Sequence, residues 1–188
     1  MQHKIIELLE EMPIIAAVKN DEECQKALSS DCKVIFLLYG TICNVGELVT
    51  QIKAREKVAI VHLDLIDGLE HTVMAVEFIN NCTNADGIIS TKSAVIRAAK
   101  EKGLFAVQRF FLLDSLAFEN ISKHITQGVP DMVEILPGVM PKVIRKLAVL
   151  SPVPVIAGGL ILDKEDVICA LSAGASAVST SMQEVWKA

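Results

Sequence analysis

Two short segments in the last third of the chain carry residues that could hold a phosphate group. Gly158 and Gly159 follow one apolar run, and Thr180 and Ser181 close the next. Glycine lets backbone N–H groups approach an anion closely, and hydroxyl groups add further donors. The alternative is structural, with glycines that only permit a tight turn and hydroxyls that only cap a helix. The choice depends on whether the fold brings both segments to one place.

Three polar residues also interrupt apolar runs: His62, Asp64 and Glu134. Burying a polar side chain costs free energy unless it contacts a ligand or another polar group. His62 and Asp64 are two residues apart, so in a strand both side chains point to the same side. They could form an acid–base dyad, a ligand clamp or a polar pair in the core. Because no nucleophile or second acid is nearby in sequence, binding or structure is favoured over catalysis, and no catalytic residue is predicted.

Positive charge and further hydrogen-bonding capacity come from Lys92, Gln108 and Arg109, which stand at the ends of two other apolar runs. Glu134 could accept hydrogen bonds from substrate hydroxyls, or Lys92 or Arg109 could neutralise it as a structural pair. For the two cations, a solvated helix start or a weak salt bridge at the rim is the alternative. Three histidines lack the spacing of metal ligands, so no metal site is expected: His3, His71 and His124.

The elements that must position these residues follow a regular pattern of a short apolar run and then an amphipathic stretch. Strands alternating with helices form parallel sheets, whose strands read as continuous apolar runs. Eight runs are expected as strands: 13–18, 33–39, 57–64, 85–91, 104–110, 131–137, 153–159 and 175–181. Gly103 is expected to end one helix, and Asp163 to cap the start of another.

Eight such units predict a single compact TIM-type (β/α)8 parallel barrel over residues 1–188, with short loops and a short last helix. An open doubly wound sheet is the alternative, but it usually carries glycines in its first strand-to-helix turn, and residues 18–24 have none. Barrels often bind phosphate with the loops after strands seven and eight and a short extra helix. The glycine and hydroxyl segments lie in those two loops, and residues 182–188 could form the helix. A phosphate site is therefore favoured.

Composition limits the cell compartment and the class of partner. The chain has 52% hydrophobic but only 4% aromatic residues, which indicates an aliphatic core. Its five cysteines form no C-x-x-C pair, and neither a signal peptide nor a membrane-spanning run is recognisable, so we expect a cytoplasmic protein without a membrane partner. The net charge of −5 argues against general nucleic-acid binding, so RNA contact would need a local basic patch or a partner subunit.

Longer motifs then become recognisable: VHLDLIDG (61–68), GIISTKSAVIRAAKEKGLFAVQRFFLLDS (87–115), VEILPGVMPKVI (133–144) and PVIAGGLILDKEDVICALSAGASAVSTS (154–181). Through them the chain resembles the bacterial glycerol-3-phosphate-responsive antiterminator family, regulators of glycerol-uptake operons. The resemblance implies a barrel that senses glycerol-3-phosphate as its effector, without a cofactor. When loaded, such a protein would bind leader mRNA so that transcription continues past a terminator.

Two functions stay open. One, favoured by the resemblance, is this RNA regulator, with Gly158, Gly159, Thr180 and Ser181 holding the phosphate, and His62, Asp64 and Glu134 holding the polyol. Loop closure would draw in Lys92 and Arg109, and Arg97, Lys100 and Lys102 are candidate RNA contacts, although a solvated helix face also explains those three. The other function is an enzyme acting on a sugar or polyol phosphate, which the fold favours by analogy alone. A homo-oligomer is left open.

Overall fold

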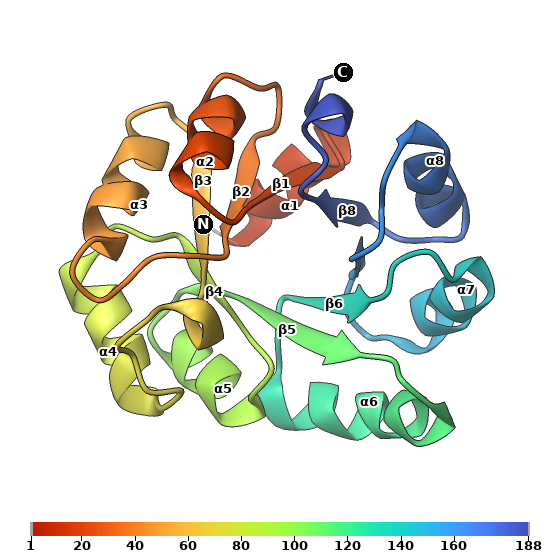
Figure 1. Ribbon diagram of the computed structural model, residues 1–188. Helices are drawn as coiled ribbons and strands as arrows, with labels where there is room; N and C mark the ends of the chain where they lie inside the picture. Colours follow the sequence, from red (N-terminus) through yellow and green to blue (C-terminus); the bar gives the residue numbers. More distant parts are fainter. Residues whose placement is uncertain (1, 188) are drawn as a thin grey trace.

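The computed structural model describes residues 2–187, which form the expected closed barrel of parallel strands (Figure 1). The strands lie in chain order around the barrel, and β1 pairs with β8 to close it. The strands are β1 (Ile14–Val18), β2 (Val34–Leu37), β3 (Val58–His62), β4 (Gly87–Ser90), β5 (Phe105–Phe111), β6 (Met132–Leu136), β7 (Val155–Gly158) and β8 (Ala177–Thr180). The fold predicted from the sequence is confirmed.

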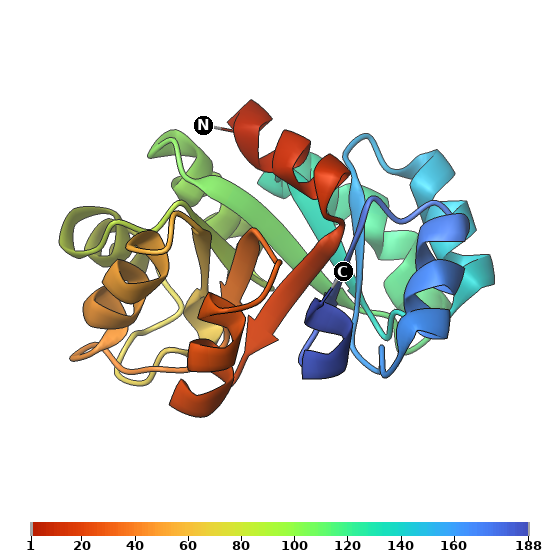
Figure 2. The ribbon, with the colours of Figure 1, turned by 90° about the horizontal axis from the view of Figure 1, so that it is seen from above.

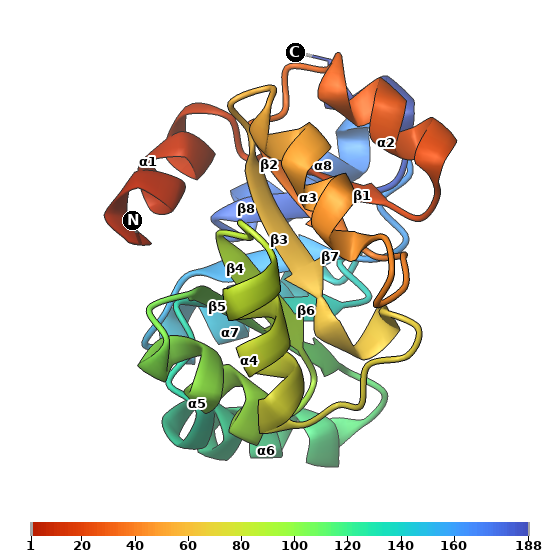
Figure 3. The same cartoon turned by 90° about the vertical axis from the view of Figure 1, so that its left-hand side faces the viewer.

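Helices surround the strands, because each connection between parallel strands must cross back over the sheet. They are α1 (Gln2–Glu11), α2 (Asp21–Leu28), α3 (Val45–Lys53), α4 (Val73–Cys82), α5 (Ser93–Glu101), α6 (Ser115–Gly128), α7 (Pro141–Leu150) and α8 (Lys164–Ser172), with 3-10 turns η1 (Leu63–Leu65) and η2 (Gln183–Trp186). Figure 3 shows α3 and α4 outside the neighbouring strands. No helix within residues 2–187 is long and apolar enough to span a bilayer.

Two predicted helix boundaries are confirmed. Gly103 follows α5 with φ of 77°, a left-handed conformation that favours glycine. Asp163 caps α8 by accepting a hydrogen bond from the backbone N–H of Asp166. The last helix is short, as expected, and is the 3-10 turn η2.

The sequence-based reading did not predict α1, which covers the end of the barrel where the strands begin (Figure 2). Its buried residues Ile5 and Leu9 pack against the residues that fill the barrel interior. The helix α1 is amphipathic along its length, so its apolar side closes the N-terminal end of the barrel interior while its acids remain exposed. The other end of the barrel is left for a ligand.

Strand alternation decides which side chains enter the barrel. On β5, Phe105 and Val107 belong to the interior cluster and Arg109 is the next residue of the same parity. On β6, Met132 belongs to that cluster and Glu134 follows it. The apolar layers therefore fill the lower part of the interior, and polar side chains occupy the last inward positions at the C-terminal end.

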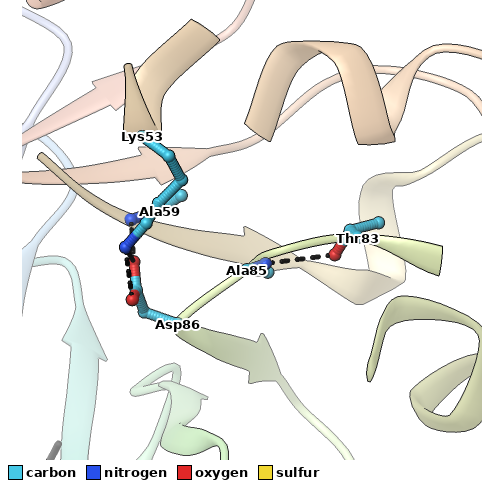
Figure 4. A network of polar contacts seen from close by, with 5 residues as sticks. All are labelled: Lys53, Ala59, Thr83, Ala85 and Asp86. Atoms are coloured by element: carbon cyan, nitrogen blue, oxygen red, sulfur yellow. Dashed lines mark hydrogen bonds and ion pairs between the residues drawn. The ribbon is translucent and has the colours of Figure 1, made fainter. Parts of the chain in front are cut away.

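The N-terminal ends of the strands are tied by a repeated polar contact. Asp86, just before β4, accepts hydrogen bonds from Lys53 Nζ at 2.6 and 2.7 Å and from the backbone N–H of Ala59 at 2.9 Å (Figure 4). Asp131, just before β6, accepts from Lys100 Nζ at 2.5 Å and from the N–H of Ala106 at 2.9 Å. Each aspartate thus joins its own strand to the preceding strand and to the helix that leads into that preceding strand.

Candidate functional site

A cavity of 290 Å³ opens at the C-terminal end of the barrel, between the loops that follow β7 and β8. Gly159, Thr180 and Ser181 all line it, and Gly158 is the residue before Gly159. The structure therefore brings the two predicted phosphate-binding segments to one place. Their role in binding a phosphate stays a prediction.

A buried polar group lies in the wall of this cavity. Glu134 accepts a hydrogen bond from Arg109 Nε at 2.5 Å and another from the Ser179 hydroxyl at 2.5 Å. Glu134 is fully buried, and Arg109 is only 7% exposed. A Cβ at position 158 would come within 2.6 Å of Glu134 Oε1 and of Ser179 Oγ. Gly158 is therefore required to leave room for the carboxylate, which is a different reason from anion approach.

Arg109 is held from behind by this carboxylate. Its Nε bonds Glu134, and the residue also lines the cavity, so the fixed planar fork of the guanidinium has further N–H donors available on that side. Of the two roles considered for Glu134, the observed contacts are those of a neutralising partner for Arg109, and its bonding to a polyol stays a prediction. The alternative of a solvated helix start does not apply to Arg109, because the residue is buried and its inward parity places it inside the barrel.

Gln108, grouped with Arg109 from the sequence, does not reach the cavity. It has the opposite parity on β5, is fully buried, and donates from Nε2 to the Ser93 hydroxyl of α5 at 2.7 Å. Lys92 is exposed and precedes α5 as its N-cap residue, without lining the cavity. The structure therefore gathers only Arg109 from the three residues predicted for the rim.

Thr180 is already committed to the loop. Its hydroxyl donates to the carbonyl of Ile161 at 2.7 Å and accepts from the N–H of Met182 at 3.0 Å. Its carbonyl accepts from the indole Nε1 of Trp186 at 2.8 Å. Because a hydroxyl has one proton, Thr180 joins the two cavity loops and η2, and Ser181 is the hydroxyl with more freedom to meet a ligand.

His62 and Asp64 do not share one strand face, which corrects the parity argument. β3 ends at His62, and Asp64 lies in η1. Asp64 accepts hydrogen bonds from the Ser90 hydroxyl at 2.7 Å and from the N–H and hydroxyl of Thr91 at 2.8 and 2.9 Å. Burial opposes ionisation of Asp64, but these bonds hold its pKa below the usual value.

His62 is one of two buried side chains within residues 2–187 with an atom that has no hydrogen-bond partner, and Gln108, through its Oε1, is the other. His62 is 3% exposed, and its Nδ1 has no hydrogen-bond partner among the residues that the structure describes. Burial first, and the Arg109 charge second, lower the pKa of His62 to about 3. The imidazole is therefore neutral near pH 7, when one ring nitrogen donates and the other accepts. A ligand hydroxyl could meet either requirement.

Two residues of the site were assigned no role from the sequence. Lys19, directly after β1, lines the cavity as an exposed cation, and Ser179 holds Glu134 in place. Both stand at strand ends, and in a closed barrel β1 must lie beside β8, so the order of the strands was the signal that could have found Lys19. Leu160 also lines the cavity with φ of 60°, an uncommon conformation for a branched residue.

Comparison with known proteins identifies the family. The model of the glycerol-3-phosphate responsive antiterminators matches residues 14–186, which is nearly the whole chain and includes every residue of the site. The chain belongs to this family. The resemblance drawn from the motifs is therefore confirmed.

Other proteins are similar to this chain in sequence, and two of them also in solved structure. The uncharacterized protein YgcP of Escherichia coli (strain K12) is 43% identical over 182 residues, covering 97% of this chain and 95% of that protein. A glycerol uptake operon antiterminator regulatory protein from Listeria monocytogenes has a TM-score of 0.90 at 35% identity, with 93% and 95% of the two chains covered. An antiterminator-related protein from Thermotoga maritima has a TM-score of 0.80 at 36% identity, with 92% and 96% covered.

The α5 cations suggested as RNA contacts of the antiterminator are engaged within the fold. Lys100 pairs with Asp131 at 2.5 Å, and Lys102 pairs with Glu77 at 2.6 Å. Arg97 is exposed and also has an interaction partner. These pairs neutralise much of the positive charge of α5, which weakens the case for this face as the RNA contact.

Proposed function

We propose that this antiterminator senses glycerol-3-phosphate in the cavity at the C-terminal end of the barrel. The observation that carries the proposal is Arg109, a buried cation fixed by Glu134 at the wall of a cavity that two phosphate-type loops enclose. Binding pockets for drug-sized molecules usually exceed about 300 Å³. A cavity of 290 Å³ suits a small polar effector.

The two halves of the effector match two sets of groups. The phosphate would meet the backbone of Gly158 and Gly159, the Ser181 hydroxyl beside Thr180, and the cations Lys19 and Arg109. The glycerol hydroxyls would meet Glu134, which lines the cavity and orients Arg109, and, beyond the cavity lining, Asp64 and the neutral His62. No cofactor is needed for recognition of this kind.

The loaded protein would then bind leader mRNA in the cytoplasm and let transcription pass a terminator. A regulator requires two states with different RNA affinity, and the effector can shift them only by its own differential affinity. Such coupling is typically about 1–3 kcal/mol. Closure of the loops after β7 and β8 around the phosphate dianion would provide the second state, and Lys92 at the start of α5 would move toward the anion.

Calorimetric titration tests effector binding. Glycerol-3-phosphate should bind more tightly than glycerol or inorganic phosphate, because only the ester fills both sets of groups. Lys19→Gln should weaken binding by about 1.5 kcal/mol, or roughly tenfold, since a charge-assisted contact is lost. Lys33→Gln, which removes an exposed cation before β2 at the other end of the barrel, is the matched control.

The alternative is an enzyme acting on a sugar or polyol phosphate, and the fate of the ligand distinguishes this enzyme from a sensor. A sensor should return glycerol-3-phosphate unchanged after prolonged incubation, which phosphorus NMR measures. Consumption of the ligand would move the protein to the enzyme class. Equal affinity for inorganic phosphate and for glycerol-3-phosphate would mean that the groups assigned to the polyol contribute nothing to binding.

A further inference from the structure

The exposed face of α7 carries an unusual concentration of positive charge for this acidic protein. Lys142, Arg145 and Lys146 all face solvent on α7, whereas the chain as a whole has a net charge of −5. Residues 135–162 contain no aspartate or glutamate at all. Within residues 2–187, no carboxylate forms an ion pair with any of these three cations. Their charge is therefore available to a partner, unlike that of Lys100 and Lys102 on α5.

Two surface pockets, the second of them a groove, adjoin these cations. One, of 530 Å³, is lined by Lys142, Arg145 and Lys146 together with the exposed side chains Val149 and Leu150. The other, of 370 Å³, lies between α7 and the start of α6, and Lys146 borders both. Its wall is mostly apolar and includes Leu113, Phe118 and Val143, with Asp114 and Glu119 on the α6 side. Figure 1 shows α7 on the outside of the barrel between α6 and α8.

This combination fits an unpaired RNA strand. Phosphates bind cations, whereas the unstacked bases of a single strand need apolar or aromatic surfaces on which to pack. An A-form duplex would present phosphates but no free base faces, and it would leave the 370 Å³ groove unfilled. The two acids of that groove can accept hydrogen bonds from amino groups of bases, as carboxylates do.

The same helix is connected to the effector cavity. The N–H of Gly138, in the loop that leads from β6 to α7, donates to the carbonyl of Gly159 at 3.0 Å. A Cβ at position 138 would lie 2.8 Å from the backbone nitrogen of Gly158, so only glycine permits this approach. Leu136, at the end of β6, lines the cavity and packs over Gly159. A shift of the Gly159 loop is therefore transmitted to the segment that begins α7 at Pro141.

We infer that the exposed face of α7, formed by Lys142, Arg145 and Lys146, together with the adjoining groove beside Phe118, binds single-stranded RNA, and that the Gly138–Gly159 contact couples this surface to the effector cavity. The inference rests on the proposed function for the existence of an RNA partner. It adds the surface, the strandedness of the RNA and the route of coupling.

The test is fluorescence anisotropy with a labelled transcript of the untranslated leader of a glycerol-uptake operon from the same genome, at saturating glycerol-3-phosphate and two salt concentrations. The triple variant Lys142→Gln, Arg145→Gln, Lys146→Gln should lose at least tenfold in RNA affinity. The slope of log affinity against log salt should fall by about 2, since each phosphate contact of a single strand contributes about 0.7.

The matched control removes the same residue types from elsewhere on the surface: Lys33→Gln, Arg55→Gln and Lys187→Gln. Its RNA affinity should stay within threefold of the parent protein. Both triple variants should bind glycerol-3-phosphate as the parent does and keep its melting temperature, because all six side chains are exposed.

Equal losses in the two triple variants, or full affinity in the α7 variant while the parent binds RNA, would overturn the inference and leave the proposed function intact. A parent that binds effector but no RNA at either salt concentration would overturn the inference and the RNA-binding part of the proposed function, and would leave effector binding intact. The parent protein should also bind the single-stranded leader more tightly than the same leader annealed to its complementary strand. Equal affinity for the two would contradict the preference for single strands that the groove indicates.

Discussion

The two ends of the barrel use polar residues in different ways. At the N-terminal end, Asp86 and Asp131 each bond a lysine and a backbone N–H, so that every carboxylate has a charged and a peptide partner. At the C-terminal end, Arg109 faces a cavity, and the buried His62 Nδ1 has no partner among the described residues. One end is internally satisfied, and the other retains unused hydrogen-bonding capacity.

The difference separates stability from binding. A buried polar group without a partner costs free energy, and at His62 a ligand hydroxyl could supply the missing bond. In barrels of this type, ligand sites lie at the C-terminal ends of the strands, whereas conserved contacts at the other end serve stability. Glu134 is the exception that joins the two roles, because it stabilises the buried charge of Arg109 at the ligand end.

Removing that carboxylate should have the largest effect. Glu134→Ala leaves Arg109 buried without a counter-charge, so the free energy of unfolding should fall by about 3–5 kcal/mol, measured by urea denaturation. The control, Ser179→Ala, deletes only one hydrogen-bond donor to the same carboxylate and should cost about 1 kcal/mol. A smaller loss for Glu134→Ala than for Ser179→Ala would contradict the assignment of Glu134 as the partner that stabilises Arg109.

An intermediate effect is expected at the opposite end. Asp86→Ala removes the acceptor of the Ala59 N–H and the partner of Lys53, and should lower the free energy of unfolding by about 1–3 kcal/mol. Affinity for glycerol-3-phosphate should be unchanged in calorimetry at a temperature where the variant is folded. Asp131→Ala should behave alike, because its contacts are the same. Weaker effector binding with intact stability would break the comparison between the two ends.

A smaller change for each unit of pH is expected from protonation of His62, whose pKa burial and Arg109 lower to about 3. Between its ordinary value of 6.5 and about 3, the unfolded chain binds a proton that the folded protein does not. Stability from this residue is therefore fully present above pH 6.5 and falls, as pH decreases, by about 1.4 kcal/mol per unit.

Urea denaturation at several pH values measures this slope, with His62→Gln as the control that should lose it. NMR of the imidazole should show a neutral ring at pH 5. A ring that titrates near 6.5 would mean that His62 is solvated. It would then no longer distinguish the C-terminal end of the barrel from the N-terminal end as a buried group without a partner.

The sequence alone determined the class of fold and the region of the site. Apolar runs of strand length, separated by amphipathic helices, specified a parallel barrel because both faces of such strands must be buried. The order of the runs placed Gly159, Thr180 and Ser181 in the two loops that now line one cavity. The motifs identified the antiterminator family, which the comparison with known proteins shows.

Only the tertiary structure decided how the polar side chains are used. Because β3 ends at His62, Asp64 does not lie on the same strand face as His62. On β5, the opposite parities of Arg109 and Gln108 direct Arg109 into the barrel and Gln108 toward α5. The sequence could not reveal that Lys100 is neutralised by Asp131, because the two are 31 residues apart and meet only when α5 packs against β5. Hydrophobic periodicity is a local property that the chain carries in its sequence, whereas hydrogen-bond and charge pairing depend on distances of a few ångströms that folding alone sets.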